Sequence, residues 1–184
     1  MKPSYAKRIG RALGTAALLV LGTTAAQDGD SYLYLRTPNA ALSARVGAER
    51  VTGPDLQLVR DGKTLRGRAF GQVVFLGLNG KELGGTVGRE LTRLSFEDKG
   101  NALEARGSFY GNLARLSFTP EGFSGTVGPC SYDLKATRDG DYMGSRSCGG
   151  LPERPVLLSI PPALTAQGPA MTLATVALLL GGGG

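Results

Sequence analysis

The chain has 184 residues, with 21 Lys and Arg against 15 Asp and Glu, for a formal net charge of +6. It contains two Cys, no Trp and no His. Without His, a Ser-His-Asp triad, a Cys-His pair and a His-ligated metal site are all excluded.

The N-terminal segment, residues 1–26, has the pattern of a secretory signal peptide. It joins a basic start without acids, an apolar run over 12–22 and small residues before a polar stretch. We expect cleavage after Ala26, which leaves Gln27 as the first mature residue. The apolar run is too short to cross a hydrocarbon core of about 30 Å, which needs roughly 20 residues. We therefore predict an exported protein of the bacterial periplasm, cell surface or extracellular space.

Removal of this segment lowers the predicted charge. The segment holds four of the 21 basic residues and no acid, so 17 bases face 15 acids in the remainder. The basic balance of the whole chain thus reflects targeting, and we predict no nucleic-acid partner. The remaining length is typical of one domain with its own core.

The predicted β domain covers residues 27–160. Its first strands are expected at 31–36, 41–46 and 55–60, separated by turns at Pro38-Asn39 and Gly53-Pro54. Beyond them, an internal repeat with an offset of forty residues matches about 66–88 to 106–128. The segment "FGQVVFLGLNGKELGGTVG" at 70–88 is echoed by "YGNLARLSFTPEGFSGTVG" at 110–128.

Apolar and polar residues alternate with a period of two in each copy, which is typical of half-buried antiparallel strands. Turn glycines recur every 18 to 22 residues, often after Asp or Asn, at Gly62, Gly80, Gly100, Gly122 and Gly140. We predict a mainly all-β fold, an antiparallel up-and-down meander that closes into a β-barrel or a sandwich, with a short C-terminal α-helix.

A second set of glycines lies inside the predicted strands, at Gly67, Gly85, Gly107, Gly125 and Gly144. Glycine weakens a strand but permits a sharp bend or a close crossing. We interpret these residues as sites of sheet curvature. The alternative is a groove that admits a ligand backbone.

The two cysteines, Cys130 and Cys148, flank the turn at Arg138-Asp139-Gly140 symmetrically. A three-residue hairpin loop there would place them directly opposite one another, near the separation that a disulfide needs. We predict a cross-strand disulfide, whose closed loop of roughly 19 residues would contribute about 3 kcal/mol.

The C-terminal segment, residues 161–184, is apolar and uncharged. The stretch 156–160 before it is expected to be a last strand or an extended strap. A helix is predicted from Pro169, with Gly181 ending it. Because its residues are apolar all round, the helix belongs in a protein interior or in lipid. We expect it to dock on or plug the β domain. A membrane contact and a processed anchoring tail are the alternatives.

We identify no catalytic residue, no metal ligand and no cofactor site in the sequence. The one candidate constellation is an outward basic stripe, Arg66, Arg68, Arg93, Arg106 and Arg115 with Tyr110 nearby, suited to an anionic glycan or lipid headgroup. The alternative is that these arginines lie on a solvent-exposed face of the sheet, where nearby acidic residues balance their charge. An acidic turn at 138–142 lacks the ligand spacing of a calcium loop.

The functional hypothesis is a non-enzymatic module of the cell envelope or secreted fraction, structural or binding a small apolar or anionic ligand. A closed meander could hold an apolar ligand in its lumen. The alternative is a carbohydrate-active enzyme that uses paired carboxylates. An outer-membrane barrel is disfavoured, because Arg and Glu occupy predicted outward positions.

Overall fold

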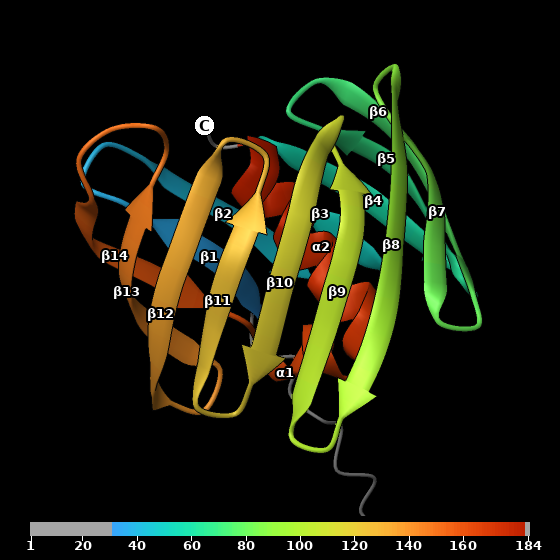
Figure 1. The fold of residues 1–184 in the computed structure, drawn as a ribbon. Coiled ribbons are helices and arrows are strands. Elements are labelled where there is room, and N and C mark those ends of the chain that lie inside the picture. The colour runs from blue at the N-terminus through green and yellow to red at the C-terminus, as the bar shows by residue number, and fades with distance from the viewer. Residues whose placement is uncertain (1–30, 183–184) are drawn as a thin grey trace, which may run out of the picture.

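The computed structural model describes residues 31–182, and the predicted signal peptide lies outside this range. The described chain forms a closed antiparallel β-barrel of 14 strands with two C-terminal helices (Figure 1). The predicted all-β meander is thus confirmed, and it closes as a barrel rather than as a sandwich.

The strands follow one another around the barrel in sequence order, and the first pairs with the last. The first seven are β1 (Tyr32–Arg36), β2 (Ala41–Val46), β3 (Arg50–Thr52), β4 (Leu56–Asp61), β5 (Thr64–Ala69), β6 (Gln72–Asn79) and β7 (Glu82–Val87). The second seven are β8 (Glu90–Lys99), β9 (Ala102–Phe109), β10 (Asn112–Thr119), β11 (Gly122–Val127), β12 (Cys130–Arg138), β13 (Asp141–Ser147) and β14 (Glu153–Ser159). The sequence reading missed the three-residue strand β3, which is too short to show an alternating pattern.

The two copies of the repeat form equivalent three-stranded units, β5–β7 and β9–β11. Arg66 stands opposite Phe75 in the first unit, and Arg106 stands opposite Arg115 in the second. Both residues of the second pair lie forty positions after their counterparts in the first pair. The repeat therefore preserves the register as well as the strand pattern.

The interior strand glycines lie where neighbouring backbones approach closely. A Cβ added to Gly107 would come within 1.9 Å of the carbonyl oxygen of Arg93 on β8, and φ at Gly107 is +152°. The same distance is 1.9 to 2.0 Å at Gly67, Gly85, Gly125 and Gly144. Contact with the adjacent strand thus accounts for these glycines, in agreement with the curvature interpretation and without a ligand.

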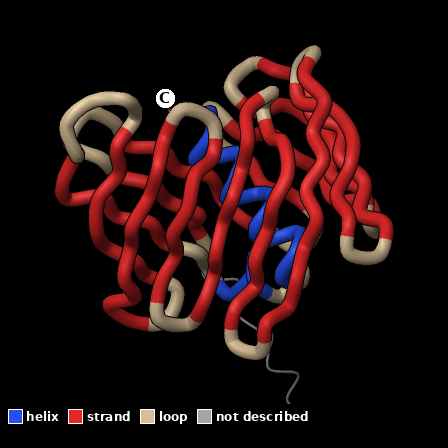
Figure 2. The backbone as a smooth tube through the Cα atoms, viewed as in Figure 1, coloured by secondary structure: helices blue, strands red, loops and turns tan. Residues whose placement is uncertain are grey.

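The long C-terminal helix α2 (Pro169–Gly182) lies inside the barrel (Figures 1 and 2). Every residue from Met171 to Leu180 is buried, because strands surround the helix on all sides. A short helix, α1 (Pro162–Thr165), which the sequence reading did not predict, precedes it. The expectation of a helix that plugs the β domain is therefore met. Within residues 31–182, no helix is long and apolar enough to cross a membrane.

Two tyrosine hydroxyls donate hydrogen bonds to backbone carbonyls near the C-terminal end of α2, where the last four carbonyls have no partner within the helix. The Tyr132 hydroxyl donates to the Leu180 carbonyl at 2.9 Å, and the Tyr110 hydroxyl donates to the Leu178 carbonyl at 3.4 Å. Tyr132 also hydrogen-bonds to Arg146, a nearly buried cation whose Nε lies 2.8 Å from a Glu153 carboxylate oxygen. Barrel side chains thereby hold the helix from its C-terminal end.

The predicted disulfide between Cys130 and Cys148 is present, with its Cα atoms 4.0 Å apart. The predicted three-residue loop is wrong, since Arg138 pairs with Asp141 around a two-residue Asp-Gly turn. A register shift between Ala136 and Arg138 compensates for the shorter loop. Ser131 consequently pairs with Ser147, and the cysteines meet one position further along. The disulfide fits a non-reducing compartment.

Candidate functional site

The five arginines of the predicted stripe fall into two groups. Arg66 and Arg68 lie on β5, whereas Arg93, Arg106 and Arg115 lie on the adjacent strands β8, β9 and β10. Strands β6 and β7 separate the groups. The structure thus assembles three of the five residues on one outer surface and leaves two apart.

Ion pairs neutralise several of these cations at the surface. Arg66 lies 3.5 Å from Asp61, Arg93 lies 3.0 Å from Glu82, and Arg106 lies 2.6 Å from Glu104, measured between guanidinium nitrogen and carboxylate oxygen. Exposed pairs of this kind contribute little to stability. No carboxylate in residues 31–182 pairs with Arg115, which is the least compensated member of the β8–β10 group.

Tyr110 does not share the outer surface with these arginines. It occupies a turn with φ of 53°, is partly buried, and directs its hydroxyl to α2. Burial raises its pKa to about 12. Tyr110 lies in a turn, where the alternation of inward and outward residues along a strand no longer applies. Its ring therefore points toward the interior.

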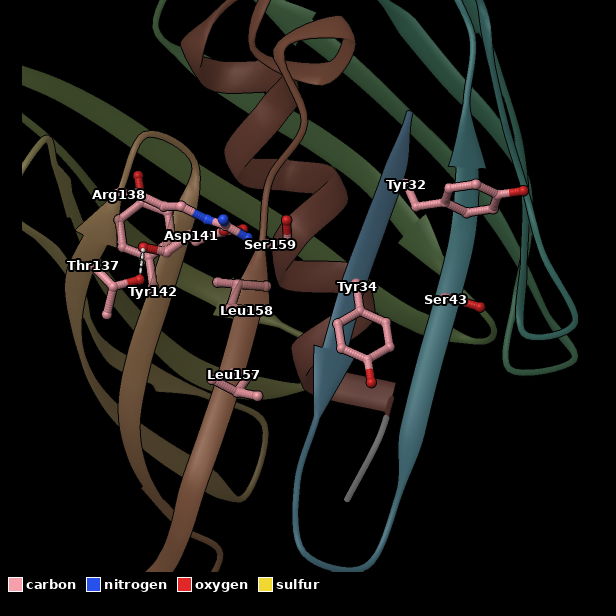
Figure 3. Close-up of a pocket in the computed structure, with 10 residues that line it drawn as sticks. All are labelled: Tyr32, Tyr34, Ser43, Thr137, Arg138, Asp141, Tyr142, Leu157, Leu158 and Ser159. Carbon is pink, nitrogen blue, oxygen red and sulfur yellow. Dashed lines mark hydrogen bonds and ion pairs between the residues drawn. The ribbon is translucent and has the colours of Figure 1, made fainter. Parts of the chain in front are cut away.

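A groove separate from the arginines lies where β1 pairs with β14 and closes the barrel. The sequence did not predict that these strands are neighbours. We call this groove the seam groove; its volume is about 520 Å³. Its lining residues are Tyr32, Tyr34, Ser43, Thr137, Arg138, Asp141, Tyr142, Leu157, Leu158 and Ser159. Figure 3 shows the residues of β1 and β2 on one side, those of β12 and β13 on the other, and β14 between them.

The register of the closing strands places four polar groups in one row across the groove. Tyr34 stands opposite Ser43 on β2 and opposite Ser159 on β14, and Ser159 in turn stands opposite Asp141 on β13. Tyr32 lies two residues from Tyr34, so the two rings share the outer face of β1. Tyr32 is 47% exposed, while Tyr34 is half-buried. The groove therefore offers an aromatic wall beside a row of hydrogen-bonding groups.

The opposite wall carries an ion pair between Arg138 and Asp141. A hydrogen bond from Ser159, together with one from Arg138, holds the pKa of Asp141 below its usual range. Thr137 donates its hydroxyl to the Asp141 backbone carbonyl at 3.2 Å, which ties the two strands of the hairpin together. Asp141 is thus an anion at neutral pH, and the pair gives the groove no net charge.

The side chains that line the seam groove offer aromatic surface, hydroxyl groups and one ion pair. Asp141 is the one carboxylate among the ten lining residues, and its lowered pKa makes it a poor proton donor. Both cysteines are joined in the disulfide. Within residues 31–182, no three His, Cys, Asp or Glu side chains are grouped so that they could hold a metal ion.

One sequence signal could have indicated the groove. Tyr32 and Tyr34 are two residues apart on one strand, so both side chains project from its outer face. This pair of large aromatic side chains on one outer face is the signal. Their partners on β12–β14 lie more than a hundred residues away. Only barrel closure brings the two walls together.

Comparisons of the chain with known protein families, with curated proteins and with solved structures give no match.

Proposed function

We propose that the protein is an exported, non-enzymatic binding module that holds a small, uncharged ligand with an apolar face in the seam groove. The observation that carries this proposal is the pairing of an aromatic wall, Tyr32 and Tyr34, with hydrogen-bonding groups in a hollow of about 520 Å³. Pockets for small ligands combine apolar lining with a few placed polar groups in this way.

The filled interior supports an external site. A lumen ligand would have to share the barrel with α2, whose residues from Met171 to Leu180 are buried on every side. The disulfide and the predicted signal peptide together support export to the periplasm, cell surface or extracellular space. The charge balance of Arg138 and Asp141 favours an uncharged ligand over an anion at this place.

The enzyme alternative receives no support from the groove. Glycoside hydrolysis requires two carboxyl groups about 5 to 10 Å apart, one of them able to donate a proton. Asp141 is a single carboxylate with a lowered pKa. A module that binds without turnover therefore agrees better with the lining residues.

Binding of a neutral apolar dye, N-phenyl-1-naphthylamine, tests the proposal. We expect its fluorescence to rise with the wild-type protein and its affinity to fall about tenfold in Tyr34→Ala, because loss of a buried aromatic contact removes about 1–2 kcal/mol. Phe75→Ala is the matched control, since Phe75 is a 58% exposed aromatic on β6, away from the groove. Unchanged affinity in Tyr34→Ala, or an equal loss in Phe75→Ala, would contradict the proposal.

A further inference from the structure

The repeat provides a comparison of two equivalent surfaces within one chain. Arg66, Phe75, Gly77 and Gly84 in the first copy correspond to Arg106, Arg115, Ser117 and Ser124 in the second. The register is the same in both, since Gly77 stands opposite Gly84 and Ser117 stands opposite Ser124. Because both sets of side chains are compatible with one backbone arrangement, the barrel itself does not require the differences between them.

The first copy shows that the backbone does not require glycine at Gly77 and Gly84. A Cβ added to Gly84 would meet no atom within 4 Å, and one added to Gly77 would meet a single carbonyl oxygen at 4.0 Å. Neither residue has the positive φ that favours glycine. Serine at both places in the second copy therefore adds two hydroxyl groups that nothing in the packing demands.

The second copy also introduces an electrostatic cost. Arg106 and Arg115 are directly opposed on β9 and β10, an arrangement that destabilises a strand pair when both side chains carry the same charge. In the first copy, Phe75 faces the arginine instead. The pairing of two arginines thus calls for an anion that compensates them.

The nearest carboxylate does not supply that compensation fully. Glu104 accepts from Lys99 at 3.0 Å and from Arg106 at 2.6 Å. The hydrogen bond with Lys99 lowers the pKa of Glu104, so this carboxylate is already engaged by two cations. Arg115 keeps no carboxylate partner among residues 31–182.

These residues line a hollow of about 310 Å³ on the outside of the barrel. Its lining residues are Glu104, Ala105, Arg106, Arg115, Leu116, Ser117, Ser124 and Gly125. Glu104, which stands opposite Ser117, is the one carboxylate among them, and it is engaged by Lys99 and Arg106. Asp133 on β12 stands opposite Ser124 and bounds the surface on the side away from the arginines. Guanidinium groups beside hydroxyl donors suit the oxygens of a sulfate, phosphate or carboxylate group.

We propose that Arg106, Arg115, Ser117 and Ser124 form a second binding site, which takes an oxyanion group. The site is separate from the seam groove and does not depend on it. Arg115 makes charge-assisted hydrogen bonds to the anion, Arg106 shares its guanidinium between the anion and Glu104, and the two serines donate from β10 and β11.

Titrations of the isotopically labelled protein, followed by amide chemical shifts, test this site. The two probes are inorganic phosphate and dextran sulfate, with neutral dextran as the control polymer. We expect saturable shifts confined to β9–β11 with at least one anionic probe. Shifts with both probes identify a site for any oxyanion, and shifts with dextran sulfate alone identify one for a polymer-borne group. No shifts in β9–β11 with either probe would overturn the proposal.

Two variants make the test specific. Arg115→Gln should weaken binding about tenfold, because it removes a charge-assisted contact, and Ser124→Gly, which restores the first-copy residue, should weaken it less. Arg66→Gln is the control, since it removes one positive charge from the outer surface of the first copy, at the position equivalent to Arg106. An equal loss in Arg66→Gln and Arg115→Gln would show general charge attraction and would also overturn the proposal.

Discussion

Phe70 and Tyr110, forty residues apart in the chain, occupy the same turn position in the two copies of the repeat, and both rings lie against the end of α2. Their φ angles are 49° and 53°, a left-handed conformation that is uncommon outside glycine. A Cβ on Gly182 would lie 1.9 Å from a ring carbon of Phe70, and one on Gly181 would lie 2.8 Å from a ring carbon of Tyr110. The repeat thus supplies two aromatic side chains that close the barrel over its helix.

This packing predicts that a larger side chain at the helix end destabilises the fold. We expect Gly182→Leu to lower the free energy of unfolding by about 1–3 kcal/mol, since the added side chain must displace the Phe70 ring. Urea denaturation measures the change. Gly150→Ala serves as the control, because a Cβ there meets no atom within 4 Å. Equal stability of Gly182→Leu and the wild type would show that the ring does not pack on the helix end.

The strand glycines provide a matched pair of substitutions. Gly107→Ala should destabilise the fold by about 2 kcal/mol or more, because its Cβ would overlap the Arg93 carbonyl oxygen and its φ is unfavourable for other residues. Gly84→Ala should be neutral or stabilising by up to about 1 kcal/mol, because its Cβ meets open space. Chemical denaturation of both variants checks the contrast. A larger loss at Gly84 than at Gly107 would refute the close approach of β8 and β9.

Removal of the disulfide should lower stability through the unfolded state. The bond joins residues separated by 18 positions, and a loop of this size corresponds to about 3 kcal/mol. We therefore expect the double variant Cys130→Ser, Cys148→Ser to unfold at lower urea concentration and to be insensitive to a reducing agent. The wild type should shift toward the variant when it is reduced. Persistence of the full wild-type stability under complete reduction would contradict this account.

Stability should also depend on alkaline pH through the buried tyrosines. Burial raises the pKa of Tyr110 to about 12, against about 10 in the unfolded chain. The unfolded state therefore loses its proton first, and the contribution present below about pH 10 is lost as the pH rises toward about 12. Tyr110→Phe should show a shallower loss of stability across this range. Denaturation curves at a series of pH values measure the slope, and identical slopes in the two proteins would show that Tyr110 is not buried in solution.

The local pattern of the chain was enough to predict the strand-rich fold, the repeat and the disulfide. Alternation, turn glycines and the symmetric spacing of Cys130 and Cys148 are short-range features, and antiparallel pairing of neighbours converts them directly into structure. The helix from Pro169 was predicted for the same reason, as an apolar run bounded by Pro and Gly, although it continues through Gly181, the predicted stop, to Gly182.

The location of each proposed site depended on the closed barrel. Tyr34 and Asp141 share the seam groove because β1 pairs with β14, a contact between the two ends of the domain that no local pattern specifies. Tyr110 joined the interior, and not the basic stripe, because its left-handed turn directs the ring at α2. Which segments are strands and which residues alternate could be predicted from the amino-acid sequence alone, since those properties arise from neighbours along the chain. That the helix fills the lumen, and that the two proposed sites lie on the outer surface, depends on the three-dimensional structure, because both follow from long-range closure and from the volume that α2 occupies.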